Sequence, residues 1–305
     1  MRAAQQPLML RSFFLSLSQN RDLRRWMEHS RLAKRLTRRF IAGNTLREAI
    51  AVCDRLNTEG ILTTLDHLGE SVTDPSEANQ AREHCMEALR AIASRSLQST
   101  ISIKLTQMGL DIDEKLCFEN ARQLVAYASE IGSRVEFDME SSAYTDRTLA
   151  IVEKLHNEYG CVRAVIQAYL FRSEADIEKL NRELLPVRIC KGAYVEPPDV
   201  AFEKKSDVDT NYLKLAHALL EDGASPGIAT HDERMVEVAK PFPKDSFEYQ
   251  MLYGIRRDLQ RKLVREGYRV RVYVPYGDAW YPYFMRRLAE RPANVLFLVR
   301  NFFKN

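Results

Sequence analysis

Two adjacent arginines near the C-terminus lie in a segment whose spacing could bind a small anion. The segment reads YPYFMRRLAERPAN, residues 281–294. A helix that begins next to its first proline keeps that proline in the first turn, where the missing N–H costs little. One helix face then carries, at i, i+3, i+4 and i+7, the residues Tyr283, Arg286, Arg287 and Glu290. A guanidinium pair ordered by a glutamate suits a carboxylate, but the same spacing fits a solvent-exposed helix with salt bridges, so spacing alone leaves both interpretations open.

Polar side chains also recur where short apolar segments end. The residues in question are Lys104, Asp138, Glu140, Gln167, Tyr169, Gln250 and Tyr273, together with the segments RICKGAY (188–194) and ATHDE (229–233). A single polar residue of this kind is often only a buried, hydrogen-bonded side chain. Its recurrence at nearly every segment predicts an enzyme site at one shared edge.

Eight short, β-branched runs predict the strands that would position these residues. Their ranges are 61–66, 101–106, 134–139, 162–168, 187–190, 227–230, 247–252 and 270–274. Amphipathic segments such as 77–96 and 211–223 lie between them and predict helices. A strand–helix unit repeated over about 250 residues is typical of a (βα)8 TIM-like barrel, whose active site lies at the carboxyl ends of the strands. We therefore predict an α/β chain with a barrel domain over 44–305, preceded by a helical arm over 1–43.

Composition excludes several classes of protein. The net charge of the 305 residues is only +3, which is too small to predict a nucleic-acid partner. The five cysteines are scattered without a CxxC pair, as in a chain that keeps reduced thiols in a cytoplasmic compartment. The histidines lack paired ligand spacing, so no metal site is predicted. No apolar run approaches the roughly 20 residues of a membrane span, although peripheral contact by the arm or by the C-terminal tail stays open.

The segment RICKGAY has two chemical interpretations. Arg188, Lys191 and the Gly192–Ala193 backbone follow a predicted strand, and cations with close backbone approach suit a phosphate or a ring that becomes anionic on reduction. The plain alternative is a strand exit whose glycine makes the turn. No GxGxxG or GxxxxGK[ST] motif is present, so a dinucleotide would not bind on a Rossmann fingerprint. A lysine at a strand end also fits a Schiff-base aldolase.

Taken together, the motifs resemble the proline dehydrogenase family, including the matching domain of bifunctional proline-utilisation enzymes. The resemblance rests on SIKLTQMG, FDME, IQAYL, RICKGAY, ATHDERM, FEYQMLYG, VYVPYG and YFMRRLAERPAN, and it runs from about residue 60 to the C-terminus in a chain similar to the short, monofunctional bacterial form. It implies a distorted barrel that holds FAD, with the last helix over the barrel mouth. The implied reaction oxidises L-proline to Δ1-pyrroline-5-carboxylate, the first step of proline degradation to glutamate. Hydride would pass to flavin N5, and a quinone-type acceptor would reoxidise the flavin.

The resemblance also implies roles for single residues. Arg286 and Arg287 would bind the proline carboxylate, with Lys104 completing the clamp and Glu290 ordering the arginines. The substrate ring would lie against Tyr194, Tyr273 and Tyr283. The catalytic residues would be Asp138, near the flavin in a role that the sequence does not define, and Arg188, near flavin N5. Further FAD contacts would come from Met139, Gln167, Lys191, Gly192, Ala193, Thr230 and His231.

Two positions bear on how closely the family pattern holds. The family motif often continues THN, whereas this chain has Asp232 after His231, and the added negative charge puts that cofactor contact in doubt. Tyr283 favours proline over 4-hydroxyproline, because relatives that oxidise hydroxyproline are expected to carry a smaller residue there. A different cyclic amino acid remains the alternative substrate within this class, and a basic binding module acting through the arm is the alternative outside it. A cytoplasmic location is expected, while homo-oligomerisation and contact with the inner face of the membrane stay open.

Overall fold

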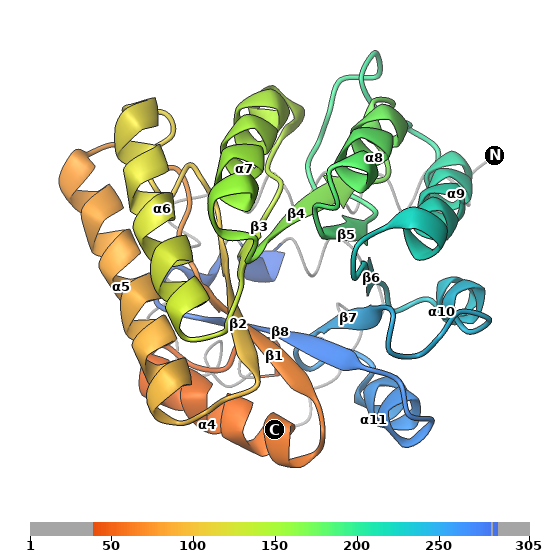
Figure 1. Ribbon diagram of the computed structural model, residues 1–305, viewed down its shortest axis with the longest axis horizontal. Helices are drawn as coiled ribbons and strands as arrows, with labels where there is room; N and C mark the ends of the chain where they lie inside the picture. Colours follow the sequence, from red (N-terminus) through yellow and green to blue (C-terminus); the bar gives the residue numbers. More distant parts are fainter. Residues whose placement is uncertain (1–38, 282, 286–305) are drawn as a thin grey trace, which may run out of the picture.

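A closed barrel of parallel strands forms the centre of the protein. The computed structural model describes residues 39–281 and 283–285, and within them each strand pairs with the next while β8 pairs back with β1 (Figure 1). The strands are β1 Leu62–His67, β2 Ser99–Ile103, β3 Val135–Phe137, β4 Val162–Gln167, β5 Val187–Cys190, β6 Gly227–Ala229, β7 Glu248–Leu252 and β8 Val270–Tyr276. The predicted (βα)8 fold is therefore confirmed.

Helices cover the outside of the barrel, as Figure 1 shows. They are α4 Leu46–Thr58, α5 Pro75–Ser94, α6 Glu114–Glu130, α7 Thr145–Tyr159, α8 Ser173–Arg182, α9 Lys205–Asp222, α10 Glu233–Ala239 and α11 Arg257–Arg265, with the short 3-10 helix η1 Ser142–Tyr144 before α7. Local sequence sets several of their starts: Asp74 caps α5 ahead of a first-turn proline, and Thr45 forms a capping box with Glu48 in α4. No helix in this described part of the chain is long and apolar enough to cross a membrane.

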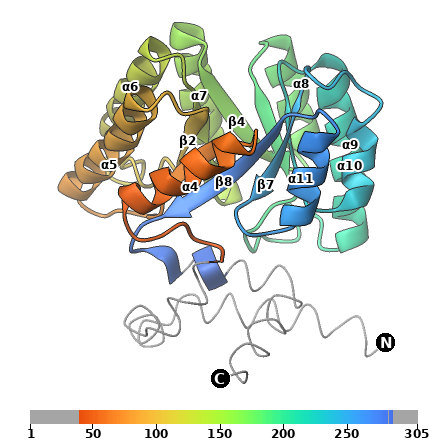
Figure 2. The same cartoon turned by 90° about the horizontal axis from the view of Figure 1, so that it is seen from below.

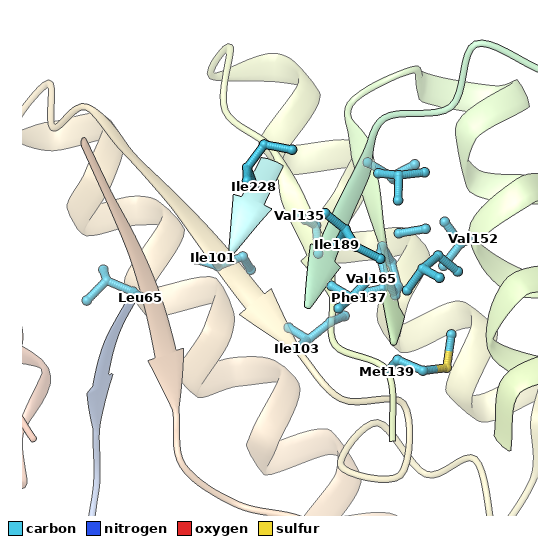
Figure 3. Close-up of a cluster of buried hydrophobic side chains, with 14 of the residues drawn as sticks. Leu65, Ile101, Ile103, Val135, Phe137, Met139, Val152, Val165, Ile189 and Ile228 are labelled. Atoms are coloured by element: carbon cyan, nitrogen blue, oxygen red, sulfur yellow. The ribbon is translucent and has the colours of Figure 1, made fainter. Parts of the chain in front are cut away.

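The apolar core lies between the strands and the helices. Side chains alternate between the two faces of a strand, and the apolar ones, such as Ile101, Ile103, Val135 and Phe137, are fully buried in this layer (Figure 3). The alternate positions therefore point into the barrel, and in this chain most of them are polar, with Val165, Ala229 and Leu252 among the exceptions. Polar side chains at the inward positions explain why the predicted strands end in polar residues.

Charged side chains fill the interior of the barrel near the amino ends of the strands, where Val, Ile and Leu are usual. We call Glu136, Arg163, Glu248 and Arg271 the basal ion-pair layer. Arg163 pairs with Glu136 at 3.2 Å and also with Glu248, which pairs with Arg271 at 2.8 Å. The Gln250 amide donates to Glu136 Oε2 at 3.3 Å, and since β7 and β3 are not neighbours this contact must cross the interior.

The basal layer balances two positive charges against two negative ones. Burial alone would raise the pKa of Glu248, but the positive charges of Arg163 and Arg271 hold the pKa of that carboxyl well below its usual range. A buried charge without such a partner would be strongly destabilising. The ion pairs of the layer therefore compensate its buried charges.

Some predicted positions shift slightly along their strands. Lys104 directly follows β2, whereas Gln250 and Tyr273 lie within β7 and β8 and not at their ends as predicted. Strands in a barrel are tilted and staggered, so residues at different points along different strands reach the same depth.

The segment after β8 begins the predicted last helix. Residues 280, 281 and 283–285 are helical, and Figure 2 shows this short segment at the edge of the barrel toward which the β8 arrow points. Trp280 and Phe284 pack on each other with ring centroids 6.0 Å apart, and Phe40 lies 6.1 Å from Phe284. The predicted residues Arg286, Arg287 and Glu290 lie outside the described residues, as does the 1–43 arm up to residue 38.

Candidate active site

One cavity of about 430 Å³ opens at the carboxyl ends of the strands, a volume within the usual range of ligand pockets. All described residues that were predicted to contact substrate or cofactor line it, whereas Glu140 and Tyr169, also named among the polar strand-end residues, do not. The predicted residues that line it are Lys104, Asp138, Met139, Gln167, Arg188, Lys191, Gly192, Ala193, Tyr194, Thr230, His231, Tyr273 and Tyr283. Their arrangement agrees with the sequence-based site, although their chemical roles remain predictions.

Lys104 lies between two buried carboxylates. Its Nζ donates to Asp138 Oδ2 at 3.0 Å and to Asp66 Oδ1 at 3.3 Å. Burial alone would lower the pKa of Lys104, but the neighbouring charges, Asp66 first among them, raise it well above its usual value. Lys104 therefore presents a permanent positive charge at the cavity wall.

Asp138 binds four donors at once. Its Oδ1 accepts from Ser102 Oγ at 2.7 Å and from Arg188 Nη2, while its Oδ2 accepts from Lys104 Nζ and from Tyr273 Oη at 2.6 Å. Burial alone would raise the pKa of Asp138, but Lys104 and Arg188 outweigh burial and hold that pKa well below its usual range. Asp138 is thus a fixed anion that orients two cations and a phenol.

Asp66 is a site residue that the sequence analysis missed. It is 0 % exposed, and its Oδ2 has no hydrogen-bond partner within the described chain. Burial raises the pKa of Asp66 in spite of the nearby Lys104 charge, so the two carboxylates on one lysine are perturbed in opposite directions. The sequence did contain the signal, because Asp66 ends the predicted strand 61–66 in the same way as the polar residues at the other strand ends.

Arg188 extends from β5 toward the cavity. Its Nη1 donates to Gln250 Oε1 at 3.3 Å, and its Cζ lies 5.5 Å from the centroid of the Tyr273 ring. Burial alone would lower the pKa of Arg188, but Asp138 and Glu136 raise it, so the guanidinium stays charged. Its buried Nε finds no partner among residues 39–281 and 283–285.

The backbone after β5 lies close against a ring. Gly192 has φ +110°, and a Cβ at this position would lie 2.3 Å from carbons of the Tyr169 ring. Only glycine fits this conformation and this contact without strain. Lys191, next to it, pairs with Asp209 at 2.6 Å, so part of the positive charge predicted beside the cofactor is already compensated.

Within the ATHDE segment, the charge of the additional acidic residue is compensated by a nearby arginine. Asp232 Oδ1 accepts from the Arg234 backbone N–H at 3.1 Å at the start of α10, and its Oδ2 pairs with the Arg234 guanidinium at 3.0 Å. Hydrogen bonding from Arg234 lowers the pKa of Asp232. His231 Nε2 accepts from the Leu252 backbone N–H at 2.9 Å, so that nitrogen carries no proton.

Known proteins match this chain over nearly its whole length. A family model described as proline dehydrogenase matches residues 49–300. Proline dehydrogenase 1 of Bacillus subtilis (strain 168) is 42% identical over 304 residues, which cover 97% of this chain and 100% of that protein. The proline dehydrogenase of Deinococcus radiodurans is 41% identical over 280 residues, covering 88% of this chain and 90% of that protein.

A solved structure with the same fold belongs to a longer protein. Proline utilization A from Bdellovibrio bacteriovorus, inactivated by N-propargylglycine, superposes with a TM-score of 0.79 at 27% identity, and the match covers 90% of this chain but 34% of that one. This chain therefore corresponds to about a third of the bifunctional relative. The resemblance drawn from the motifs is confirmed, and the chain belongs to the proline dehydrogenase family.

Proposed function

We propose that this chain oxidises L-proline to Δ1-pyrroline-5-carboxylate with FAD as its cofactor. The observation that carries the proposal is the shared cavity, in which the charged pair Lys104–Asp138 and the guanidinium of Arg188 face the same space as the tyrosines. Membership of the family supports the reaction class, and the similarity to proline dehydrogenases of Bacillus subtilis and Deinococcus radiodurans supports proline as the substrate. The catalytic domain is proposed to span 44–305.

The residues at the cavity wall fit a flavin. Arg188, Lys191 and the Gly192–Ala193 backbone line the cavity, and the buried Arg188 Nε is a donor without a partner in the described chain. The residues proposed to hold FAD are Met139, Gln167, Arg188, Lys191, Gly192, Ala193, Thr230 and His231. When bound, FAD would supply the two-electron acceptor for oxidation of the ring carbon beside the proline nitrogen.

The substrate carboxylate would be held by cations. Lys104 keeps its proton because Asp66 and Asp138 surround it, and so it can meet an anion without a change of charge. Arg286 and Arg287 are proposed to complete the clamp with planar, bidentate groups, with Glu290 ordering them. The walls of Tyr194, Tyr273 and Tyr283 would exclude water from the pyrrolidine ring.

Asp138 is proposed to orient the cations beside it and not to take part in proton transfer. With four donors on its two oxygens and a lowered pKa, it is poorly suited to accept a proton from substrate. Its position explains how Lys104 and Arg188, which repel each other, stay on the same side of the cavity. A quinone-type compound is proposed as the final electron acceptor on the strength of the family resemblance.

The test is a reduction experiment with the purified protein. We expect a yellow protein whose flavin absorbance bleaches when L-proline is added without oxygen and returns with a soluble quinone. 4-Hydroxyproline is the comparison substrate and should bleach the flavin far more slowly. A protein that stays colourless after incubation with FAD would refute the proposal, and faster bleaching by 4-hydroxyproline would reassign the substrate.

A further inference from the structure

The loop of residues 191–204, between β5 and α9, forms one wall of the cavity. Its first residues, Lys191 to Tyr194, line the cavity, so their position decides the shape of the site. Backbone hydrogen bonds fix both ends of the loop. The Tyr169 N–H donates to Lys191 O at 3.0 Å, and the Phe202 N–H donates to Tyr169 O at 2.8 Å.

The middle of the loop is largely exposed. Val195 is 75% exposed, and residues 197–199 are exposed as well. Glu196 is different, because it is half-buried and its carboxylate contacts other parts of the barrel mouth. A charged side chain that turns away from solvent in an exposed loop needs a specific set of partners.

Glu196 has three such partners in two different segments. Its Oε1 accepts from the Ser142 backbone N–H at 2.8 Å and from Tyr169 Oη at 3.1 Å, and its Oε2 accepts from Ser142 Oγ. Ser142 begins η1, four residues after Asp138. Hydrogen bonds to an ionised acceptor are roughly twice as strong as neutral ones.

The same tyrosine supports the cavity wall. The ring of Tyr169 lies against Gly192, where a Cβ would approach to 2.3 Å, and its hydroxyl reaches Glu196. Glu196 therefore joins the loop to the segment that follows β3 and also to the ring beneath the loop. A shift of Glu196 would release both contacts together.

We propose that Glu196 is a positioning residue that latches the β5–α9 loop and so holds the wall from Gly192 to Tyr194 in place for FAD and substrate. For its ligand this inference rests on the proposed function. The charge of the carboxylate matters, because it strengthens all three contacts. A glutamine could keep its oxygen on the Ser142 N–H and the Tyr169 hydroxyl and donate from its NH2 group to the Ser142 hydroxyl, but every contact would then be neutral and roughly half as strong.

The test compares Glu196→Gln with Asp199→Asn, which removes one negative charge from an exposed position of the same loop. We expect Glu196→Gln to raise the dissociation constant of FAD at least about tenfold, a change equivalent to about 1.4 kcal/mol. We also expect trypsin to cut the loop after Lys191, Lys204 or Lys205 several-fold faster in the cofactor-stripped chain. Asp199→Asn should match the wild type in both measurements.

Ser142→Ala provides a second variant in case Glu196→Gln does not fold. It removes one of the three donors, so it should raise the FAD dissociation constant and the cleavage rate less than Glu196→Gln does. In the double variant the two effects should not add, because both act on one contact. Additive effects, wild-type FAD affinity and cleavage in Glu196→Gln, or equal losses in Asp199→Asn would each overturn the latch.

These outcomes are distinguishable from failure of the proposed function. If the wild-type chain binds no FAD, the proposed function falls, while the trypsin measurement still tests the latch. If the wild type binds FAD and oxidises proline but Glu196→Gln behaves like it, the latch alone is refuted.

Discussion

The two carboxylates on Lys104 should respond very differently to the same substitution. Asp138 and Asp66 are both buried and both accept a hydrogen bond from Lys104 Nζ, at 3.0 Å and 3.3 Å. The pKa of Asp138 is lowered by the two cations beside it, whereas the pKa of Asp66 is raised by burial. We therefore expect Asp138→Asn to be severely destabilising and Asp66→Asn to be mild.

The magnitude follows from the contacts that each change removes. In Asp138→Asn the new NH2 group must face either Lys104 and Tyr273 or Ser102 and Arg188, so one buried cation loses its ionised partner at this position. Breaking a buried ion pair on one side costs about 3–5 kcal/mol. At Asp66 burial outweighs the Lys104 charge, so the fold disfavours the ionised carboxyl; an asparagine there still accepts from Lys104, and we expect a change of about 1 kcal/mol or less.

Urea unfolding of the wild type and both variants measures this difference. With a slope of about 3 kcal/mol per molar urea, a loss of 3 kcal/mol lowers the midpoint by about 1 M. Bound cofactor adds stability of its own, so each chain is measured with and without added FAD.

The pH dependence provides an independent check on the same pair. A carboxyl whose pKa is raised on folding stabilises the fold most below its unfolded pKa, and that contribution is lost as the pH rises toward the folded value. The wild type should therefore lose stability as the pH rises above about 3.8, and Asp66→Asn should not show this loss. Equal destabilisation by the two substitutions at pH 7, or a larger loss for Asp66→Asn, would refute the reasoning.

Four further substitutions test other parts of the chain. Gly192→Ala should reduce both stability and FAD binding, because its Cβ would lie 2.3 Å from the Tyr169 ring. The control Gly160→Ala has φ +71° but nothing within 4 Å of its Cβ, so it should cost only about 1–2 kcal/mol of stability in thermal unfolding and leave FAD binding unchanged. Glu248→Gln should lower the stability at neutral pH and make stability depend less on acid pH. The wild-type carboxyl has a folded pKa below its ordinary 4.5, so its contribution to stability is present above pH 4.5 and is lost as the pH falls below that value. Urea midpoints measured between pH 7 and 3 would show this difference. Arg287→Lys should raise KM for proline strongly while FAD stays bound, and an unchanged KM in steady-state kinetics would remove Arg287 from the clamp.

The barrel and much of its site were predictable from local pattern. Each predicted strand overlaps an observed one, because short apolar runs between amphipathic helices leave little choice of fold. The residues at the strand ends, Lys104 and Asp138 among them, also lie together, since parallel strands place their carboxyl ends at one edge. The motif RICKGAY predicted either close backbone approach to a ligand or a plain strand exit; the contact between Gly192 and Tyr169 explains the glycine, and the approach to a ligand stays a prediction.

Contacts across the barrel were not predictable in the same way. The sequence places Glu136 on a strand, but nothing local shows that it meets Arg163 from the next strand and Gln250 from the far side. Strand tilt and stagger set these partners, and both depend on closure of the whole sheet. The same closure buries Asp66 beside Lys104.

The sequence by itself thus determined the order of the elements, the edge at which the chemistry lies and the residue types that gather there. Only the tertiary structure decided which of these charged groups pair with one another. Lys104 and Arg188 converge on Asp138, while Asp66 is left with a raised pKa and Lys191 is compensated by Asp209. The physical reason is that the protonation of a buried group depends on neighbours brought together from distant strands and helices, and local sequence spacing does not contain those distances.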